Sequence, residues 1–307
     1  MNKTLLLVHG RGWEPPESSL RNLWLNAIKW GLKRDVPEAA DHFNEVKIEF
    51  VYYGDINNDF LQKALNETWW DDTESMRDTL QELMKLSASQ FTRKAYDNLP
   101  DKNSFKEGVA DMLSPLLNFF QLSEEVIDQM APDMREYWND ETLFGTAVRL
   151  PMIKPFKRAL DRNGSTAIVS HSLGSMISYD ILWKFSRYGE WFDYWEKKID
   201  LFVTLGSPLG DVTVRGKLKG KDAKGERRYP GNIRKWVNIA AEDDYICHDF
   251  KISKDYREMK KLGLIESIED YKICNLSVHK GKSNPHHVFG YLVHPKTVEI
   301  LAHWILE

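Results

Sequence analysis

The 307-residue sequence predicts an α/β protein, in which about six mostly parallel strands form one sheet with helices on both faces. Two observations support this prediction. Six short runs are rich in β-branched or aromatic residues, and segments of helical periodicity separate most of them. Parallel strands need a crossover, usually a helix, between one strand and the next. The expected strands span residues 4–9, 46–53, 165–170, 201–205, 235–240 and 271–278.

Residues 57–150 interrupt this alternation, because they show almost no strand signal. Their apolar residues recur at helical spacing in three stripes, which begin at Met76, Phe105 and Val126. We therefore expect an inserted helical cap over residues 57–150. The sheet domain then consists of residues 1–56 and 151–307. Further helices are expected after the third strand, around 176–183, and at the C-terminus, over 295–306.

Composition restricts the functional class. The net charge of −4 gives no overall basic bias, so we expect no nucleic-acid partner. Cys247 and Cys274 are too few for a disulfide framework and are expected to be buried, reduced thiols. The N-terminal apolar run, residues 5–8, is too short for a signal peptide, and no run approaches the roughly 18 residues of a membrane span. We expect a cytoplasmic protein without a transmembrane segment.

The segment Ser170-His171-Ser172-Leu173-Gly174 contains the candidate nucleophile. A strand that turns abruptly into a helix strains the backbone of the turn residue and presents its hydroxyl above the sheet. Ser172 occupies that turn, and Ser170 stands where the usual Gly-x-Ser-x-Gly pattern has its first glycine. If Ser172 has no catalytic role, the same pattern is a tight corner between a strand and a helix that is built from small residues.

The other parts of a nucleophilic site have candidates at strand ends. An acid is expected among Glu242, Asp243 and Asp244, after the fifth expected strand, and a base among three histidines further on. Those histidines are His279, His286 and His287. An oxyanion hole needs two backbone N–H donors: Leu173 supplies the first, and Arg11 or Gly12 the second.

At these residues the chain resembles the α/β-hydrolase superfamily, in particular the lipase and esterase branch that includes lecithin:cholesterol acyltransferase-like and GPI-inositol-deacylase-like proteins. The resemblance covers the N-terminal strand and roughly residues 165–307, but not the expected cap. The matching segments are Leu7-Val8-His9-Gly10, His171-Ser172-Leu173-Gly174-Ser175, Thr204-Leu205-Gly206-Ser207-Pro208, Trp236-Val237-Asn238-Ile239 with Asp244, and His287 to Pro295.

The resemblance implies an α/β-hydrolase fold trimmed to about six strands and a serine hydrolase that cleaves a carboxylic ester through an acyl-enzyme. It implies Ser172 as nucleophile, Asp244 as acid and His287 as base, with His286 as the alternative. We expect no cofactor and no metal. The expected partner is a small acyl ester, with a lipid as one option, because the cap is rich in Trp, Phe and Leu. A thioesterase or an acyltransferase would use the same triad.

Two other functional classes remain open. A metal site is the rival chemistry, although no metal-ligand spacing supports it. Its candidate ligands are His286, His287, His294, His303 and the pair His248-Asp249. Alternatively, a catalytically degenerate fold could bind a partner protein through Trp69-Trp70 and the apolar stripes. The basic loop over residues 211–235 is either a solvated excursion or an electropositive lip that recruits an anionic substrate or membrane headgroups.

Overall fold

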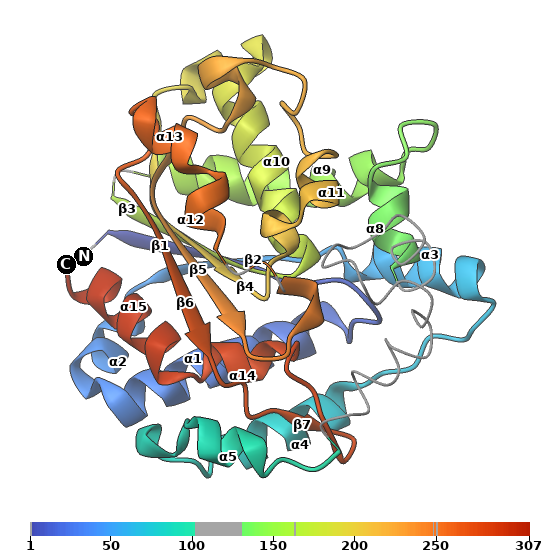
Figure 1. Ribbon diagram of the computed structural model, residues 1–307, viewed down its shortest axis with the longest axis vertical. Coiled ribbons are helices and arrows are strands. Elements are labelled where there is room, and N and C mark those ends of the chain that lie inside the picture. The colour runs from blue at the N-terminus through green and yellow to red at the C-terminus, as the bar shows by residue number, and fades with distance from the viewer. Residues whose placement is uncertain (1, 102–130, 163, 248, 250) are drawn as a thin grey trace.

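The computed structural model describes residues 2–101, 131–162, 164–247, 249 and 251–307. Within them, six parallel strands form one sheet in the order β2-β1-β3-β4-β5-β6, which confirms the predicted α/β class (Figure 1). The strands are β1 Lys3–Val8, β2 Lys47–Val51, β3 Ser165–His171, β4 Ile199–Leu205, β5 Ile233–Ala241 and β6 Ser267–Ile273. A two-stranded antiparallel hairpin, β7 Val278–His279 and β8 Lys282–Ser283, lies beyond them.

The last strand begins four residues earlier than expected, at Ser267 rather than residue 271. β6 is an edge strand with several partly exposed polar side chains, so it lacks the apolar run that marks a buried strand. It pairs with β5 from Lys235↔Ser267 to Ala241↔Ile273. The apolar residues that suggested a strand over 274–278 instead leave the sheet and lead to the histidine-bearing loop.

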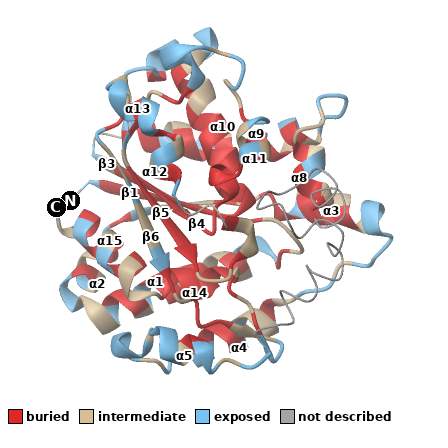
Figure 2. Ribbon diagram, in the orientation of Figure 1, coloured by how far each residue is buried: buried red, intermediate tan, exposed pale blue. Residues whose placement is uncertain are grey.

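Helices cover both faces of the sheet, and β1 shows how the two layers divide. Leu5 and Leu7 point into one apolar core with α1, α14 and α15, whereas Leu6 and Val8 point into the other core with α9 and α10. Figure 2 shows this buried sheet between the layers. The α-helices are α1 Glu17–Asp35, α2 Pro37–Phe43, α3 Gly54–Leu65, α4 Thr73–Leu83, α5 Arg93–Asp97, α8 Pro132–Tyr137, α9 Phe144–Asp161, α10 Leu173–Arg187, α11 Val212–Arg215, α12 Ile252–Asp255, α13 Arg257–Lys261, α14 Val288–Leu292 and α15 Pro295–Leu306. The short 3₁₀ turns are η1 Ala88–Gln90, η2 Gly189–Tyr194, η3 Pro208–Gly210, η4 Gly225–Arg228 and η5 Tyr245–Cys247.

The described part of the expected cap packs on both layers of the sheet domain. α4 contacts α1 and α14, whereas α9 contacts β1 and β2 on the opposite face. The expected boundary at residue 150 therefore falls inside α9, a helix of the sheet domain. The stripe that begins at Phe105 and the start of the stripe at Val126 lie outside the described residues. A cap over the site stays a prediction.

The parallel strands place their carboxyl ends at one edge of the sheet, where ligands bind in open α/β folds. The loops after β1, β3 and β5 meet at this edge, and they contain the residues proposed above for the oxyanion hole, the nucleophile and the acid. Across the described residues, no helix is both long and apolar enough to cross a bilayer. Cys247 is buried and Cys274 is partly buried, and both are free thiols.

Candidate active site

Ser172 forms the turn between β3 and α10 in a backbone conformation that non-glycine residues rarely adopt. Its φ is 52° and its ψ is −127°. Such a conformation costs on the order of 1–3 kcal/mol and persists only where the surroundings hold it. Two backbone hydrogen bonds do so: Ser172 N–H donates to Leu205 O at 3.0 Å, and Ser175 N–H donates to Ser172 O at 2.9 Å. The turn is therefore fixed at the carboxyl edge of the sheet.

Two glycines bring the end of β1 against this turn. A Cβ at Gly174 would lie 2.1 Å from His9 O, so α10 can pack this closely on β1 only with glycine there. A Cβ at Gly10 would lie 3.1 Å from Ser172 Cβ. The loop after β1 therefore runs directly beside the candidate nucleophile.

Ser172, His286 and Asp244 form a hydrogen-bonded chain. His286 Nε2 lies 2.9 Å from Ser172 Oγ, and His286 Nδ1 lies 2.8 Å from Asp244 Oδ2. With the imidazole neutral and its proton on Nδ1, His286 donates to the carboxylate and accepts from the hydroxyl. This order of nucleophile, base and acid is the arrangement that activates a serine.

His287, the base implied by the resemblance, does not face Ser172, and this expectation is corrected in favour of His286. His287 Nδ1 accepts the Phe289 N–H at the start of α14, and its ring lies 5.0 Å from that of His279. Burial, followed by the nearby His279 and His286, lowers the pKa of His287 to about 3. A contact within the turn distinguishes the two histidines: the His286 N–H donates to Asn284 Oδ1 at 3.1 Å.

Asp244 is a buried carboxylate held in its ionised form. Burial raises its pKa, but the charge and hydrogen bond of His286 and the hydrogen bonds from Tyr291 and Cys247 outweigh this effect and lower the pKa below its usual value. Tyr291 OH donates to Asp244 Oδ2 at 2.5 Å and accepts from Ala241 N–H at 2.9 Å. Tyr291 thereby connects the acid to the end of β5.

The neighbouring acids of the same run have other partners. Glu242 pairs with Arg93 at 2.7 Å and with Lys272 at 2.6 Å. Asp243 accepts from Tyr96 OH at 3.0 Å. Asp244 is therefore the acid of this run that meets the imidazole.

His171, a residue to which the sequence assigns no role, contacts the candidate base from β3. Its Nε2 lies 2.9 Å from His286 O, and the two rings are 4.7 Å apart. Burial, with His286 as the next cause, lowers the pKa of His171 well below its usual value. A neutral His171 that donates to the His286 carbonyl fixes the loop above Ser172. The only signal in the sequence was its place between the two serines of the motif.

The two candidate donors on the loop after β1 differ. Gly12 N–H donates to Asp133 Oδ2 at 3.2 Å, so it is already engaged. Arg11 N–H therefore stays the candidate second donor beside the N–H of Leu173, which starts α10 next to Ser172, and the oxyanion hole itself stays a prediction. Asp133 was not among the residues that sequence reasoning selected.

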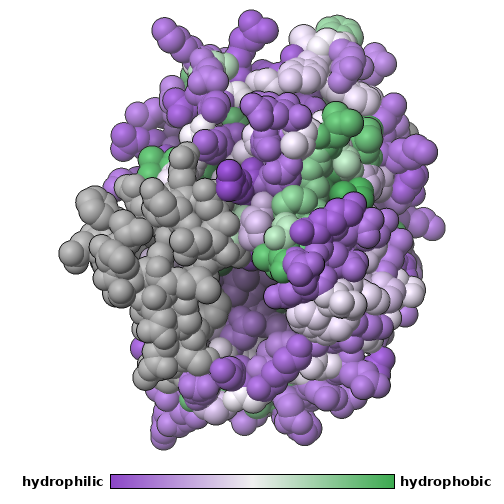
Figure 3. All heavy atoms as spheres, turned by 90° about the vertical axis from the view of Figure 1, so that its right-hand side faces the viewer, coloured by the Kyte–Doolittle hydropathy of each residue, from purple (hydrophilic) through white to green (hydrophobic). Residues whose placement is uncertain are grey.

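The candidate nucleophile is almost fully buried. Ser172 is 1% exposed, whereas 19% of the His286 side chain is exposed. Figure 3 looks onto the side toward which the strands run and shows a hollow with a hydrophilic wall.

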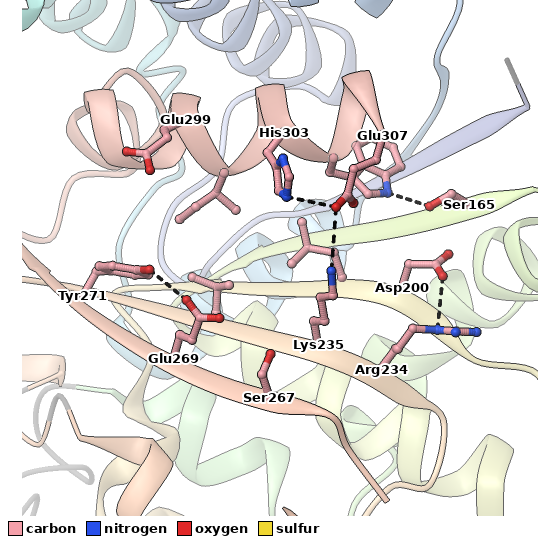
Figure 4. A pocket seen from close by; sticks show the side chains of 14 residues that line it. Ser165, Asp200, Arg234, Lys235, Ser267, Glu269, Tyr271, Glu299, His303 and Glu307 are labelled. Carbon is pink, nitrogen blue, oxygen red and sulfur yellow. Dashed lines mark hydrogen bonds and ion pairs between the residues drawn. The ribbon is translucent and has the colours of Figure 1, made fainter.

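A separate cavity of about 560 Å³ lies between α15 and strands β4–β6, and no member of the triad lines it (Figure 4). Many of its polar side chains bind one another. His303 pairs with Glu307 at 2.9 Å, and Tyr271 OH donates to Glu269 at 2.8 Å. Polar side chains that pair with one another in this way give no indication of a ligand.

The histidines proposed as metal ligands have other contacts. His294 Nδ1 accepts from Lys296 N–H at the start of α15, and His303 pairs with Glu307. Within the described part of the chain, no three His, Cys, Asp or Glu side chains gather as a metal site. His248 lies outside that part.

The basic loop and the Trp69-Trp70 pair lie against the sheet domain. Trp183 Nε1 donates to Arg227 O at 2.9 Å. Trp183 follows Ser172 by eleven helical residues, or about 16 Å, so this part of the loop lies far from the nucleophile. Trp69 Nε1 donates to Glu14 O at 3.0 Å, and the Trp70 ring lies 5.4 Å from that of Trp13. Anion recruitment and partner docking stay predictions.

Comparisons with known proteins assign this chain to no family. No family model matches the chain, and no curated protein matches its sequence. The geometry of the site is therefore the basis for assigning a function to this chain.

Proposed function

We propose that this protein is a serine hydrolase that cleaves a carboxylic ester through Ser172, His286 and Asp244. The observation that carries the proposal is the chain of two hydrogen bonds, 2.9 Å and 2.8 Å long, from the Ser172 hydroxyl through the imidazole to the carboxylate. The strained backbone at Ser172 supports it, because such strain concentrates at functional sites.

In the first step, Ser172 Oγ attacks the acyl carbonyl carbon while its proton passes to His286 Nε2. Asp244 stabilises the resulting imidazolium through Nδ1–H. The N–H groups of Leu173 and Arg11 donate to the oxyanion that forms. When the tetrahedral intermediate collapses, the ester C–O bond breaks, and the leaving alcohol takes the proton from His286 Nε2. The product is an acyl ester of Ser172.

In the second step, water attacks the acyl-enzyme. His286 Nε2 accepts a proton from the water as the new C–O bond forms, and the same two N–H groups hold the oxyanion. Collapse of this intermediate breaks the bond to Ser172 Oγ, and His286 returns the proton to the serine. Over the two steps, one ester and one water are consumed, and one carboxylic acid and one alcohol are released.

The test is covalent labelling followed by turnover. A fluorophosphonate probe should label the wild-type protein but not the Ser172→Ala variant, and a series of p-nitrophenyl esters should identify the preferred acyl length. Turnover of the variant should fall on the order of 10⁶-fold, the loss typical of a removed nucleophile. Its thermal unfolding should stay close to wild type, because a turn residue loses only its hydroxyl.

Ser170→Ala is the matched control. Ser170 is a buried serine two residues away whose hydroxyl lies 2.8 Å from Ser178 Oγ, so its loss should leave labelling intact. Labelling of the Ser172→Ala variant would contradict the assignment. A wild-type protein that is neither labelled nor active would favour the degenerate, partner-binding alternative. Thioesters and added alcohol acceptors, run in the same assay, separate a thioesterase or an acyltransferase from an esterase.

A further inference from the structure

A second buried carboxylate, Asp133, lies outside the triad and contacts the loop beside Ser172. It is the second residue of α8 and is 0% exposed. Its partners Arg11 and Gly12 lie more than 120 residues earlier in the chain. A buried carboxylate is costly unless its oxygens are paired and hydrogen-bonded.

Both oxygens of Asp133 are satisfied. Oδ1 accepts from Arg11 Nε at 2.7 Å and from its own helix at Met134 N–H, 3.0 Å away. Oδ2 accepts from Gly12 N–H at 3.2 Å and from Asn57 Nδ2 at 3.1 Å. With its lone pairs engaged in this way, Asp133 is poorly placed to serve as a general base.

The loop is held from other directions as well. Asn57 Nδ2 also donates to Gly12 O at 2.8 Å, so it closes a ring with Asp133 around Gly12. Tyr53 OH lies 2.6 Å from Gly10 O and 2.8 Å from His9 O. Gly12 has a φ of 99°, a conformation that only such external contacts select from the many open to glycine. These contacts fix the peptide planes on both sides of Arg11.

We propose that Asp133 is a positioning residue: it fixes the loop of residues 10–12 so that Arg11 N–H points at the oxyanion formed on Ser172. The proposal rests on the proposed hydrolase function. Its physical basis is that an oxyanion donor acts only within a few tenths of an ångström of its place, and removing one donor typically costs about 10²–10³-fold in kcat. Asp133 never touches the substrate.

The test compares Asp133→Asn and Asp133→Ala with wild type in three measurements. First, kcat for a p-nitrophenyl ester should fall about 10-fold in Asp133→Asn and about 100-fold in Asp133→Ala, with KM nearly unchanged. Second, inhibition by an arylboronic acid, whose tetrahedral adduct on serine needs the same donors, should weaken in parallel. Third, hydrogen exchange of the peptide that contains residues 9–16 should accelerate in both variants.

Asp180→Asn is the matched control. Asp180 is an equally buried carboxylate that accepts from Tyr137 OH and Lys219 N–H, away from the loop. Its loss should lower stability while kcat and boronate affinity stay at wild-type values. If Asp133→Ala does not fold, the same three measurements on Asp133→Asn and Asn57→Ala test the proposal, since each variant removes part of the same contacts.

Unchanged boronate affinity and loop exchange in a folded Asp133 variant would overturn the proposal. So would a loss of kcat that Asp180→Asn reproduces at equal stability. The exchange measurement does not need turnover, so it still tests the loop contacts if the wild-type protein proves inactive. Inactivity of the wild type would instead contradict the hydrolase function.

Discussion

His286 Nε2 lies 2.9 Å from Ser172 Oγ, whereas the next residue, His287, turns its ring away into the core. The two histidines share a turn and differ in their contacts. We therefore predict opposite results for their substitutions. His286→Gln should reduce ester turnover about 10⁴-fold or more, because the base is lost. His287→Asn should keep turnover close to wild type, since an Asn side chain can also accept the Phe289 N–H. Steady-state kinetics on one ester checks both.

Equal losses in the two variants would show that the loop adopts another arrangement when substrate binds. Loss in His287→Asn alone would return the role of base to His287. Circular dichroism and thermal unfolding of each variant serve as controls, because a misfolded loop would reduce turnover without any information about the base.

The strands could be predicted from the sequence because their signal is local. β1 is buried on both faces and reads as a continuous apolar run, and Ser172 follows directly from the small residues between β3 and α10. The last strand was harder to predict, since β6 is a half-exposed edge strand. Its polar residues obscure the alternation of apolar and polar positions that marks a strand. Local patterns thus located most of the sheet and the strained turn at Ser172.

The choice between His286 and His287 could not be made from local patterns. It depends on Asn284, which accepts the His286 N–H, and on His171, which contacts the His286 carbonyl from a strand 115 residues earlier. Asp133 was missed for the same reason, because its partner Arg11 is 122 residues away in the chain. Contacts at such separations leave no periodic signal in one sequence.

Tyr291 supports the acid of the triad, and its hydroxyl should matter for turnover. Tyr291→Phe removes the hydrogen bond to Asp244 and leaves the buried Ala241 N–H without its acceptor. An unpaired buried donor costs about 1–3 kcal/mol, so the free energy of unfolding should fall by that amount. We also expect kcat to fall about 10-fold, because Asp244 loses one of its ordering contacts. Urea unfolding and steady-state kinetics measure the two effects.

Tyr96→Phe is the control for this variant. Tyr96 is also buried and donates to an acid of the same run, but that acid is Asp243, which lies outside the triad. Its loss should affect stability without lowering kcat. A Tyr291→Phe variant with wild-type kcat would mean that Asp244 is held well enough by its remaining partners.

The close approach of α10 to β1 makes Gly174 sensitive to substitution. In Gly174→Ala the added Cβ would lie 2.1 Å from His9 O, so helix and strand must move apart. We expect a loss of about 1–3 kcal/mol in the free energy of unfolding, the range typical of overpacking. Gly189→Ala is the control, because an added Cβ there meets nothing within 4 Å. Thermal unfolding compares the two, and equal melting temperatures would contradict the close packing.

The buried His287 should make the protein less stable in mild acid. Its pKa of about 3 in the folded protein lies below the value of about 6.5 expected when unfolded, so between these values the unfolded chain binds the extra proton. Stability therefore falls as the pH drops below about 6.5, by about 2 kcal/mol at pH 5 from this residue alone.

His287→Asn lacks this titration but retains the acceptor at the start of α14. The difference in unfolding free energy between variant and wild type, measured in urea, should grow in favour of the variant from pH 7 to pH 5. The other buried histidines are present in both proteins, so their own titrations cancel in that difference except for their coupling to His287. A difference that stays constant over this pH range would show that His287 is protonated equally in the folded and unfolded states.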